Sequence, residues 1–490
     1  MRHLPSARRF RPLLAGLAFL AYAAAIIWVW QQDGQKSTWR AEQDASLQVA
    51  AAYLFYGKPF GSIDGGLWDF YLKHWAQPAD LFLANASDRK IPSGETIPTA
   101  MEDNALGHAY FATAALFLFG PHTSSLVFGF AALLGLSALM FLLRFPDDRI
   151  LAIAVLFSAL TLMLLRAEWP INQGPIGGIR LFVIAGIFPA LHIILELVDS
   201  GRHSAKSSRY ALLVGQFALL LSVIAIRGSA MYFVGAVAFA AILSVWVRRR
   251  DPSRRRVVVA KVAFLIMLGV VGHFAGRLLT PDAYLDAGLS DTYWHRAFIG
   301  LGEHPDWPFG DLAARMGCRP EIPKGLRPGV IDGNGHCAYV AATKKGAEAG
   351  VTYGRQYETA LRQAFLQVAT DYPEKVLETY LIYKPLAMWD TLLGSTKFEL
   401  SLGTLPIMAA VAVQLAILIA MIRLPAGERS ELRAICAAFA IIATFSLAPQ
   451  LFAWSSSWTS MDLICYLYVG ILLIPALVLR SVSTPRYASA

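Results

Sequence analysis

The sequence predicts an all-α polytopic membrane protein with about ten transmembrane helices and with interfacial helices in two long outer segments. Three observations lead to this fold class. Hydrophobic residues make up 56% of the 490 residues and charged residues only 16%, a composition suited to hydrocarbon as the main solvent. Apolar runs long enough to cross a bilayer recur along the chain. The short connections between these runs are alternately rich and poor in Lys and Arg.

The first apolar run, residues 13 to 30, is predicted to be an uncleaved membrane span. No small-residue cleavage site follows it, and Trp28 and Trp30 suit the membrane interface. The other predicted spans are residues 122 to 143, 150 to 166, 178 to 198, 209 to 226, 229 to 247, 257 to 275, 400 to 422, 432 to 452 and 460 to 480.

Basic residues predict the orientation of these spans. The connections that are rich in Lys and Arg alternate with weakly charged connections if residues 101 to 120 lie in the outer interface as a helix and do not cross the membrane. Both termini are then cytoplasmic, and residues 31 to 121 and 276 to 398 are periplasmic segments of a multi-pass protein in the bacterial inner membrane. The net charge of +9 is dispersed over short inner loops, which argues against a nucleic-acid partner. The basic connections contain Arg2, Arg8, Arg9 and Arg11, then Arg144 and Arg149, then Arg202, Lys206 and Arg209, then RRRDPSRRR at 248 to 256, then Arg423, Arg429 and Arg433, and finally Arg480 and Arg486.

We expect three parts in the chain. Residues 1 to 275 form an N-terminal transmembrane module, residues 276 to 398 an outer segment, and residues 399 to 490 the C-terminal transmembrane helices. The outer segment contains Cys318 and Cys337. An oxidising compartment favours a disulfide between them, which would close a Gly/Pro-rich loop with little core of its own. A metal site that uses the histidine beside the second cysteine would lack further ligands at a regular spacing.

The stretch STWRAEQDASLQVAAAYLFYGKPFG, residues 37 to 61, follows the first span on the outer side. From Trp39 to Tyr56 its apolar residues recur at helical spacing, and Asp44 lies near the start of the predicted helix. One interpretation is that Asp44 only complements the helix N-terminus. The other is that Asp44, at the outer membrane boundary, meets the headgroup of a lipid-linked substrate and acts as a base whose pKa is raised by burial.

Several motifs carry a family resemblance. The segment AEQDASLQVAAAYLFYGKPFG is similar to the one that follows the first span in GT-C glycosyltransferases of the protein O-mannosyltransferase and lipid A aminoarabinose-transferase type. EDNALGHAYFATAALFLFGPHTSSLVFGFAALLGL resembles their interfacial helix and next span, with Asn104 and Ala105 in place of paired prolines. SVIAIRGSAMYFVGAVAF, LRAEWPINQGPIGGIRL and the amphipathic residues 360 to 389 resemble further elements in the same order.

The resemblance implies a membrane glycosyltransferase. Such an enzyme moves a sugar from a polyprenyl-phosphate-linked donor to a glycan, lipid or protein acceptor at the outer face. Asp44 matches the acid after the first span that is proposed there to take a proton from the acceptor, and Glu42 is the alternate. The Asp-Glu dipeptide usual in the family is absent, because Ala45 follows Asp44.

Cations are expected near the donor, because a leaving lipid phosphate develops negative charge. The candidates are Arg227 and Arg166, which stand beside predicted outer turns, and Lys384, which stands where the chain returns to the bilayer. Each of them could instead only anchor the end of a span.

The predicted outer loop YWHRAFIGLGEHPDWPFGD, residues 293 to 311, combines aromatic, basic and acidic residues. Aromatic side chains stack on sugar rings and polar ones fix their hydroxyls, so this segment is a candidate lid or sugar-binding loop. His295 and Arg296 are its candidate phosphate or sugar contacts, together with His304. The alternative is an ordinary loop that is packed by its own aromatic residues.

Glu102 and Asp103 open the predicted interfacial helix and form a second acidic cluster that could approach Asp44. Oxygen ligands of this kind suit a divalent cation, but two acids do not decide whether one is bound. No other cofactor is indicated.

Two other function classes stay open. A polytopic transporter or flippase could use about ten spans and their Pro and Gly residues as a pathway, although no repeat of span lengths is apparent and charges inside the spans are few. A non-catalytic membrane assembly partner is the third reading. The two long outer segments favour the enzyme.

Overall fold

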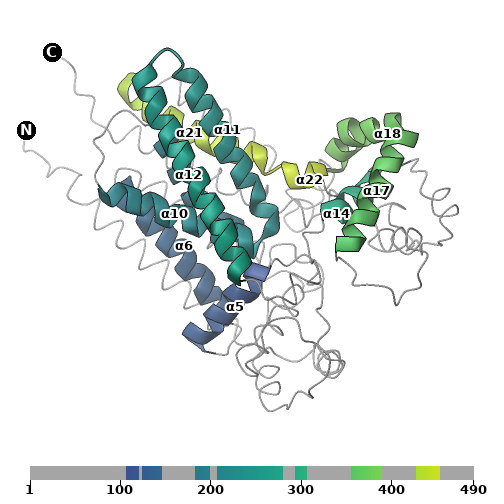
Figure 1. The fold of residues 1–490 in the computed structure, drawn as a ribbon, viewed down its shortest axis with the longest axis horizontal. Coiled ribbons are helices and arrows are strands. Elements are labelled where there is room, and N and C mark those ends of the chain that lie inside the picture. The colour runs from purple at the N-terminus through teal and green to yellow at the C-terminus, as the bar shows by residue number, and fades with distance from the viewer. Residues whose placement is uncertain are drawn as a thin grey trace, which may run out of the picture.

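The computed structural model describes residues 106–120, 124–145, 182–198, 207–279, 293–305, 355–388 and 426–452. Within these ranges the regular structure is entirely helical. A bundle of long helices, which includes α6, α10, α11, α12 and α21, occupies one part of the molecule, and a smaller group that contains α14, α17 and α18 occupies another (Figure 1). The short helix α22 (Ala448–Phe452) lies between the two groups.

Helices α5 (Leu106–Phe119) and α6 (Ser124–Arg144) form a tight helical hairpin. The turn begins at Gly120, whose φ of 92° is available to glycine at little cost, and the Ser125 hydroxyl donates a hydrogen bond to the Gly120 carbonyl at 2.6 Å. The expected helix in residues 101 to 120 is therefore present from Leu106 onward.

The centre of the bundle is formed by α8 (Phe182–Ala185) and α9 (Ile187–Val198), which are buried almost along their whole length. Around them lie α10 (Ser207–Ile226), the 3₁₀ turn η4 (Gly228–Met231) and α11 (Tyr232–Val247). Gly186, between α8 and α9, allows close packing, because a Cβ there would lie 2.4 Å from a ring carbon of Phe233.

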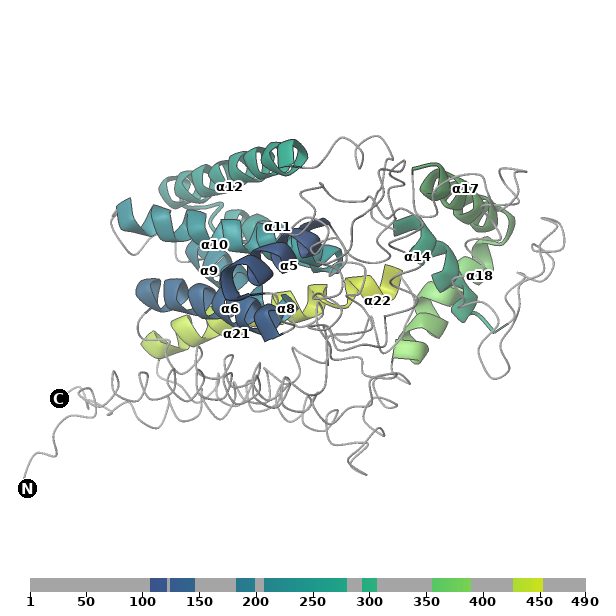
Figure 2. The same ribbon diagram turned by 90° about the horizontal axis from the view of Figure 1, so that it is seen from below.

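Helix α12 (Pro252–Leu279) lies on the outside of the bundle (Figure 2). Asp251 caps its first turn by accepting a hydrogen bond from the Arg254 amide at 3.2 Å, and Pro252 occupies the first helical position, where its missing N–H costs nothing. Two stretches of the described residues are long and apolar enough to cross a membrane, Arg209–Ile226 and Pro252–Leu278. In the apolar 18-residue part of the second stretch only 11% of the residues are buried, so most of α12 faces outward.

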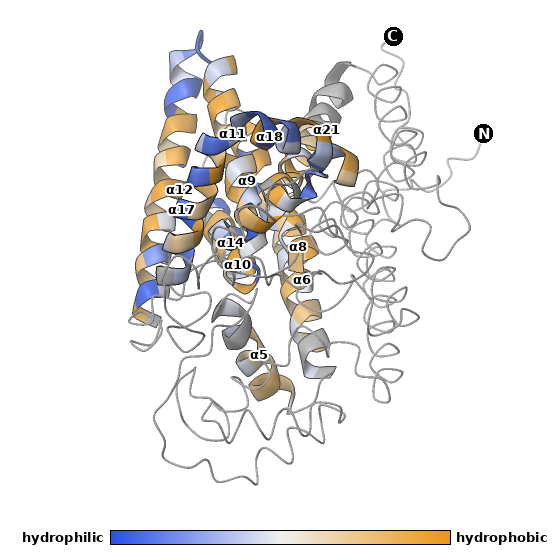
Figure 3. Cartoon of the chain, turned by 90° about the vertical axis from the view of Figure 1, so that its right-hand side faces the viewer, coloured by the Kyte–Doolittle hydropathy of each residue, from blue (hydrophilic) through white to orange (hydrophobic). Residues whose placement is uncertain are grey.

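The helical bundle has two ends, which we call the basic end and the opposite end. At the basic end, Arg144 at the end of α6 and Lys261 in α12 contact Glu196 near the end of α9, and Arg248 after α11 contacts the carbonyls that follow Glu196. The α11–α12 turn at this end is hydrophilic, whereas both helices are mostly hydrophobic along their length (Figure 3).

The opposite end contains the end of α10 and the start of α11. α5 packs there, since a Cβ at Gly107 would meet the backbone of Ala225 near the end of α10. Helix α21 (Ala426–Phe445) also ends there, because Phe445 packs on Gly235 and Phe239 in the first half of α11.

Beyond the opposite end lies the distal helical unit, which we define as residues 293–305 and 355–388 (Figure 2). Tyr357, Leu361, Ala364 and Val368 recur at helical spacing on α17 and pack against Phe298 and its neighbours in α14. The unit consists of α14 (Tyr293–Gly300), the 3₁₀ turn η5 (Leu301–Glu303), α17 (Arg355–Asp371), α18 (Pro373–Glu378) and the π-turn η6 (Thr379–Tyr383), after which the helix continues to residue 388.

The helix predictions agree with the structure where it describes the chain, with a few local differences. The span expected at residues 432 to 452 is interrupted, because α21 ends at Phe445 and α22 begins at Ala448 after a turn. The expected loop at residues 293 to 311 begins as helix α14, because its apolar residues pack on α17. The amphipathic helix expected at residues 360 to 389 is interrupted at Tyr372, since Pro373 starts a new helix. The predicted spans at residues 13 to 30, 150 to 166, 400 to 422 and 460 to 480 lie outside the described residues.

Candidate functional site

The distal helical unit gathers the polar side chains that the sequence marked around residue 295. Glu358 of α17 reaches the start of α14, where its two carboxylate oxygens accept hydrogen bonds from the backbone amides of Trp294 at 2.7 Å and of His295 at 3.2 Å. These amides belong to the first turn of α14 and have no intrahelical acceptor. Burial raises the pKa of the Glu358 carboxyl above its ordinary value of 4.5, while the two amide bonds act in the opposite direction.

His295 and Tyr357 form a second buried contact between α14 and α17. The Nδ1 atom of His295 lies 2.8 Å from the phenol oxygen of Tyr357, and both side chains are at most 5% exposed. The tautomer of the imidazole decides which group donates. His295 therefore holds two helices together in this arrangement and does not face solvent.

A third group of polar residues lies between η5 and η6. His304 is 3% exposed, and its Nε2 atom lies 2.9 Å from a carboxylate oxygen of Glu378, whose side chain is half exposed. The His304 ring also packs edge-on against Tyr383, with ring centroids 4.6 Å apart. Glu303, next to His304, is buried as well.

Lys384 connects the distal helical unit to α22, the short helix that follows the bundle helix α21. Its side chain is fully buried, and its ammonium donates a hydrogen bond to the Leu451 carbonyl of α22 at 2.9 Å and lies 4.5 Å from the centre of the Tyr380 ring. Burial lowers the pKa of Lys384 to about 7, and the nearby Glu303 carboxylate acts in the opposite direction. Near neutral pH this amine can therefore exist with or without its proton.

Arg227 is positioned by the turn between α10 and α11. Its amide continues α10 by donating to the Val223 carbonyl at 2.9 Å, and its own carbonyl accepts from Ala230 at 2.9 Å, so the residue begins the 3₁₀ turn η4. Arg227 thus lies at the opposite end of the bundle, the end from which α22 leads to the distal helical unit.

Five of the predicted site residues fall within the described part of the chain, namely Arg227, His295, Arg296, His304 and Lys384. His295 and Lys384 are buried in helix contacts, whereas Arg296 and Arg227 are partly exposed. The remaining candidates lie outside the described residues, and these are Asp44, Glu42, Arg166, Glu102, Asp103, Cys318 and Cys337.

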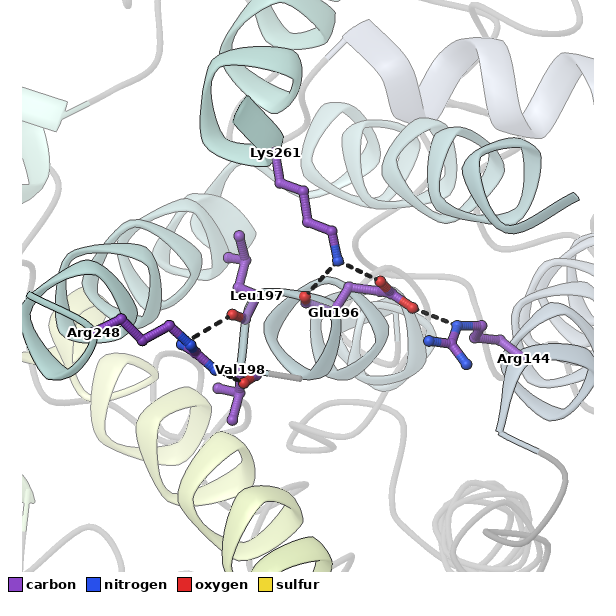
Figure 4. A network of polar contacts seen from close by, with 6 residues as sticks. All are labelled: Arg144, Glu196, Leu197, Val198, Arg248 and Lys261. Carbon is purple, nitrogen blue, oxygen red and sulfur yellow. Dashed lines mark hydrogen bonds and ion pairs between the residues drawn. The ribbon is translucent and has the colours of Figure 1, made fainter. Parts of the chain in front are cut away.

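A further polar cluster at the basic end of the bundle was not predicted (Figure 4). Glu196 forms an ion pair with the Nε atom of Arg144, and Lys261 donates to the Glu196 carboxylate at 2.7 Å and to its backbone carbonyl at 2.8 Å. Arg248 donates to the carbonyls of Leu197, at 3.4 Å, and of Val198, which satisfies the end of α9. The sequence signal for this cluster is one acid and one lysine, each alone in an apolar run.

Metal ligation finds no support in the parts of the chain that the structure describes, where no three His, Cys, Asp or Glu side chains gather in a suitable arrangement. The acidic pair of residues 102 and 103 lies outside those parts, so the expectation about a divalent cation stays a prediction. Comparison with known proteins gives no match to a family model, to a curated protein or to a solved structure.

Proposed function

We propose that this chain is a multi-pass inner-membrane glycosyltransferase of the GT-C kind, which uses a polyprenyl-phosphate-linked sugar donor at the periplasmic face. The placement of charge at the two ends of the helical bundle supports the membrane arrangement in this proposal, and the resemblance of residues 41 to 61 to the GT-C segment supports its chemistry. Arg144, Glu196, Lys261 and Arg248 meet at one end, whereas Arg227 and the distal helical unit lie at the other. Such polarity suits a membrane bundle whose outer end carries a folded unit.

In this proposal the described residues have two kinds of role. Arg227, at the outer end of α10, and the partly exposed Arg296 contact the phosphate of the donor, because fixed guanidinium groups stabilise the charge that develops as the lipid phosphate leaves. His295 and Lys384 position the distal helical unit, since both are buried in contacts between helices. Asp44 removes the proton of the acceptor, with Glu42 as the alternate.

Turnover of a defined donor tests this function. Purified full-length protein, in detergent or nanodiscs, is given a panel of polyprenyl-phosphate sugars, and the release of polyprenyl phosphate is measured with candidate acceptors present. We expect release by the wild type, loss of release in Asp44→Asn, and retained release in Gln363→Ala, an exposed substitution on α17. If Asp44→Asn and Glu42→Gln both keep full activity, the assigned base is wrong.

A carrier of small or lipid-linked solutes is the second candidate, and the buried charges of Glu196 and Lys261 favour it. Ionisable groups inside a membrane bundle often mark a transport pathway. Proteoliposomes separate the two functions. Solute flux without turnover of a lipid-linked sugar would support the carrier and contradict the enzyme.

A further inference from the structure

Among the described residues, the polar cluster at the basic end contains more positive than negative charge. Glu196 is the single carboxylate that the described residues contribute to the cluster, and Arg144 and Lys261 both contact it. Their side chains are 11% and 14% exposed, and that of Glu196 is 10% exposed. A charge excess in such a poorly solvated place is costly unless another group compensates it.

Arg144 also has hydrogen-bond donors to spare. Its Nε atom is bonded to Glu196, and the guanidinium carbon lies 4.8 Å from the centre of the Phe145 ring. Within the described ranges, the two terminal nitrogens of Arg144 make no hydrogen bond. These nitrogens form one edge of a planar fork, a geometry that matches two oxygens of an oxyanion.

His192 is a second and independent sign of a missing partner. Its side chain is fully buried, and neither ring nitrogen has a hydrogen-bond partner among the residues that the structure describes. The ring packs edge-on against Phe141 and Phe145 of α6, at 6.4 and 5.2 Å between centroids. His192 also precedes Glu196 by four residues, so the two side chains share a face of α9. The His192 ring and the Arg144 guanidinium both pack on the Phe145 ring, and an orphaned imidazole so close to an under-compensated arginine indicates that a polar group belongs there.

We propose that Arg144, His192 and Lys261 form a binding site for a phosphate-type oxyanion at the basic end of the bundle, with Glu196 as the residue that positions both cations. The anion accepts hydrogen bonds from the free edge of Arg144 and from a ring N–H of His192, and it neutralises the excess charge. The source is either the headgroup of an anionic phospholipid or a soluble phosphate. This site does not depend on the proposed glycosyltransferase function, because it lies at the other end of the bundle.

Thermal unfolding of the purified full-length protein in a neutral detergent tests the site. One arm compares sodium phosphate with sodium chloride at equal ionic strength, and the other compares phosphatidylglycerol with phosphatidylcholine in mixed micelles. We expect Tm to rise by several degrees with phosphate, with phosphatidylglycerol, or with both, since a ligand that binds only the folded state stabilises it. A response to phosphatidylglycerol alone identifies the source as lipid.

Three variants make the test specific. His192→Leu is expected to weaken the response about tenfold in apparent Kd, the effect of losing one hydrogen bond to a charged group. Arg144→Gln is expected to weaken it at least as much, because it removes both terminal N–H donors and the positive charge. Arg254→Gln is the matched control, because that arginine is exposed at the same end and its ion pair with Asp251 lies at the surface. Glu196→Gln is expected to unfold at a lower temperature without anion and to gain more from it than the wild type does, because glutamine keeps an oxygen that accepts from the cations while the charge excess grows.

Either of two results would overturn the site. The first is a wild type whose Tm responds to neither anion beyond its control. The second is an Arg254→Gln variant that loses as much of the response as Arg144→Gln does, since that outcome would indicate only general surface electrostatics. If Arg144→Gln does not fold, His192→Leu and Glu196→Gln decide the question in its place.

Discussion

Replacement of Glu358 by alanine tests how the distal helical unit is held together. The Glu358 carboxylate accepts hydrogen bonds from the backbone amides of Trp294 and His295 on another helix, at 2.7 and 3.2 Å, and these amides of the first turn of α14 have no intrahelical acceptor. The variant removes both acceptors and leaves the amides in a poorly solvated place. We therefore expect α14 to be loosened from α17.

The magnitude follows from the two hydrogen bonds. A hydrogen bond to a charged group contributes about 1.5 to 3 kcal/mol. Because burial raises the pKa of Glu358 and so weakens its charged form, we take the lower figure for each bond and expect a loss of about 3 kcal/mol. This corresponds to an increase of about 100-fold in the equilibrium constant for local opening of α14. Glu358→Gln keeps one acceptor oxygen and should lose about half of that free energy.

Hydrogen exchange of the purified protein, followed by mass spectrometry, measures local opening directly. Peptides that cover residues 293 to 300 should exchange about 100-fold faster in Glu358→Ala and about tenfold faster in Glu358→Gln. Gln363→Ala, an exposed substitution on the same helix α17, should leave them unchanged. Equal protection of α14 in Glu358→Ala and wild type would refute the reasoning.

Two further predictions concern burial. The pKa of Lys384 is lowered from 10.5 to about 7, so the unfolded chain binds more protons than the folded one between those values. The stability of the wild type should therefore rise with pH across this window and fall as pH drops toward 7. The stability of Lys384→Met should depend less on pH. Parallel pH profiles of Tm for the two proteins would contradict the lowered pKa of Lys384. Gly107→Val places a side chain 2.4 Å from the backbone of Ala225 and should lower stability by at least about 1 to 3 kcal/mol. Gly135→Ala is the matched control, because no neighbour lies within 4 Å of the added atom, and it should be neutral or stabilising in the same denaturation assay.

Apolar periodicity predicted the described helices because each pattern is local. The runs at residues 209 to 226 and 257 to 275 lie within α10 and α12, and the alternation of basic connections agrees with the common position of Arg144 and Arg248 at one end. Local periodicity did not predict helix α14 in the expected loop at residues 293 to 311. Its eight residues become helical by packing on α17, which lies about sixty residues later in the chain.

The site was less predictable than the fold for the same reason. His295 and Lys384 were chosen for their chemical type, but their burial depends on Tyr357 and on the carbonyl of Leu451, which are distant in the sequence. The pairing of Glu196 with Arg144 and Lys261 joins three helices and leaves no local pattern. Long-range contacts of this kind require the folded structure.

The placement of the two ends of the bundle on opposite sides of a membrane can be measured by cysteine labelling. Gln363→Cys marks the distal helical unit and Ser253→Cys marks the α11–α12 turn, and both positions are exposed. A membrane-impermeant maleimide is applied to right-side-out spheroplasts and to inverted membrane vesicles, and labelling above the wild-type level is recorded. We predict labelling of Gln363→Cys only in spheroplasts and of Ser253→Cys only in inverted vesicles. Labelling of both variants from the same side would contradict the proposed membrane arrangement.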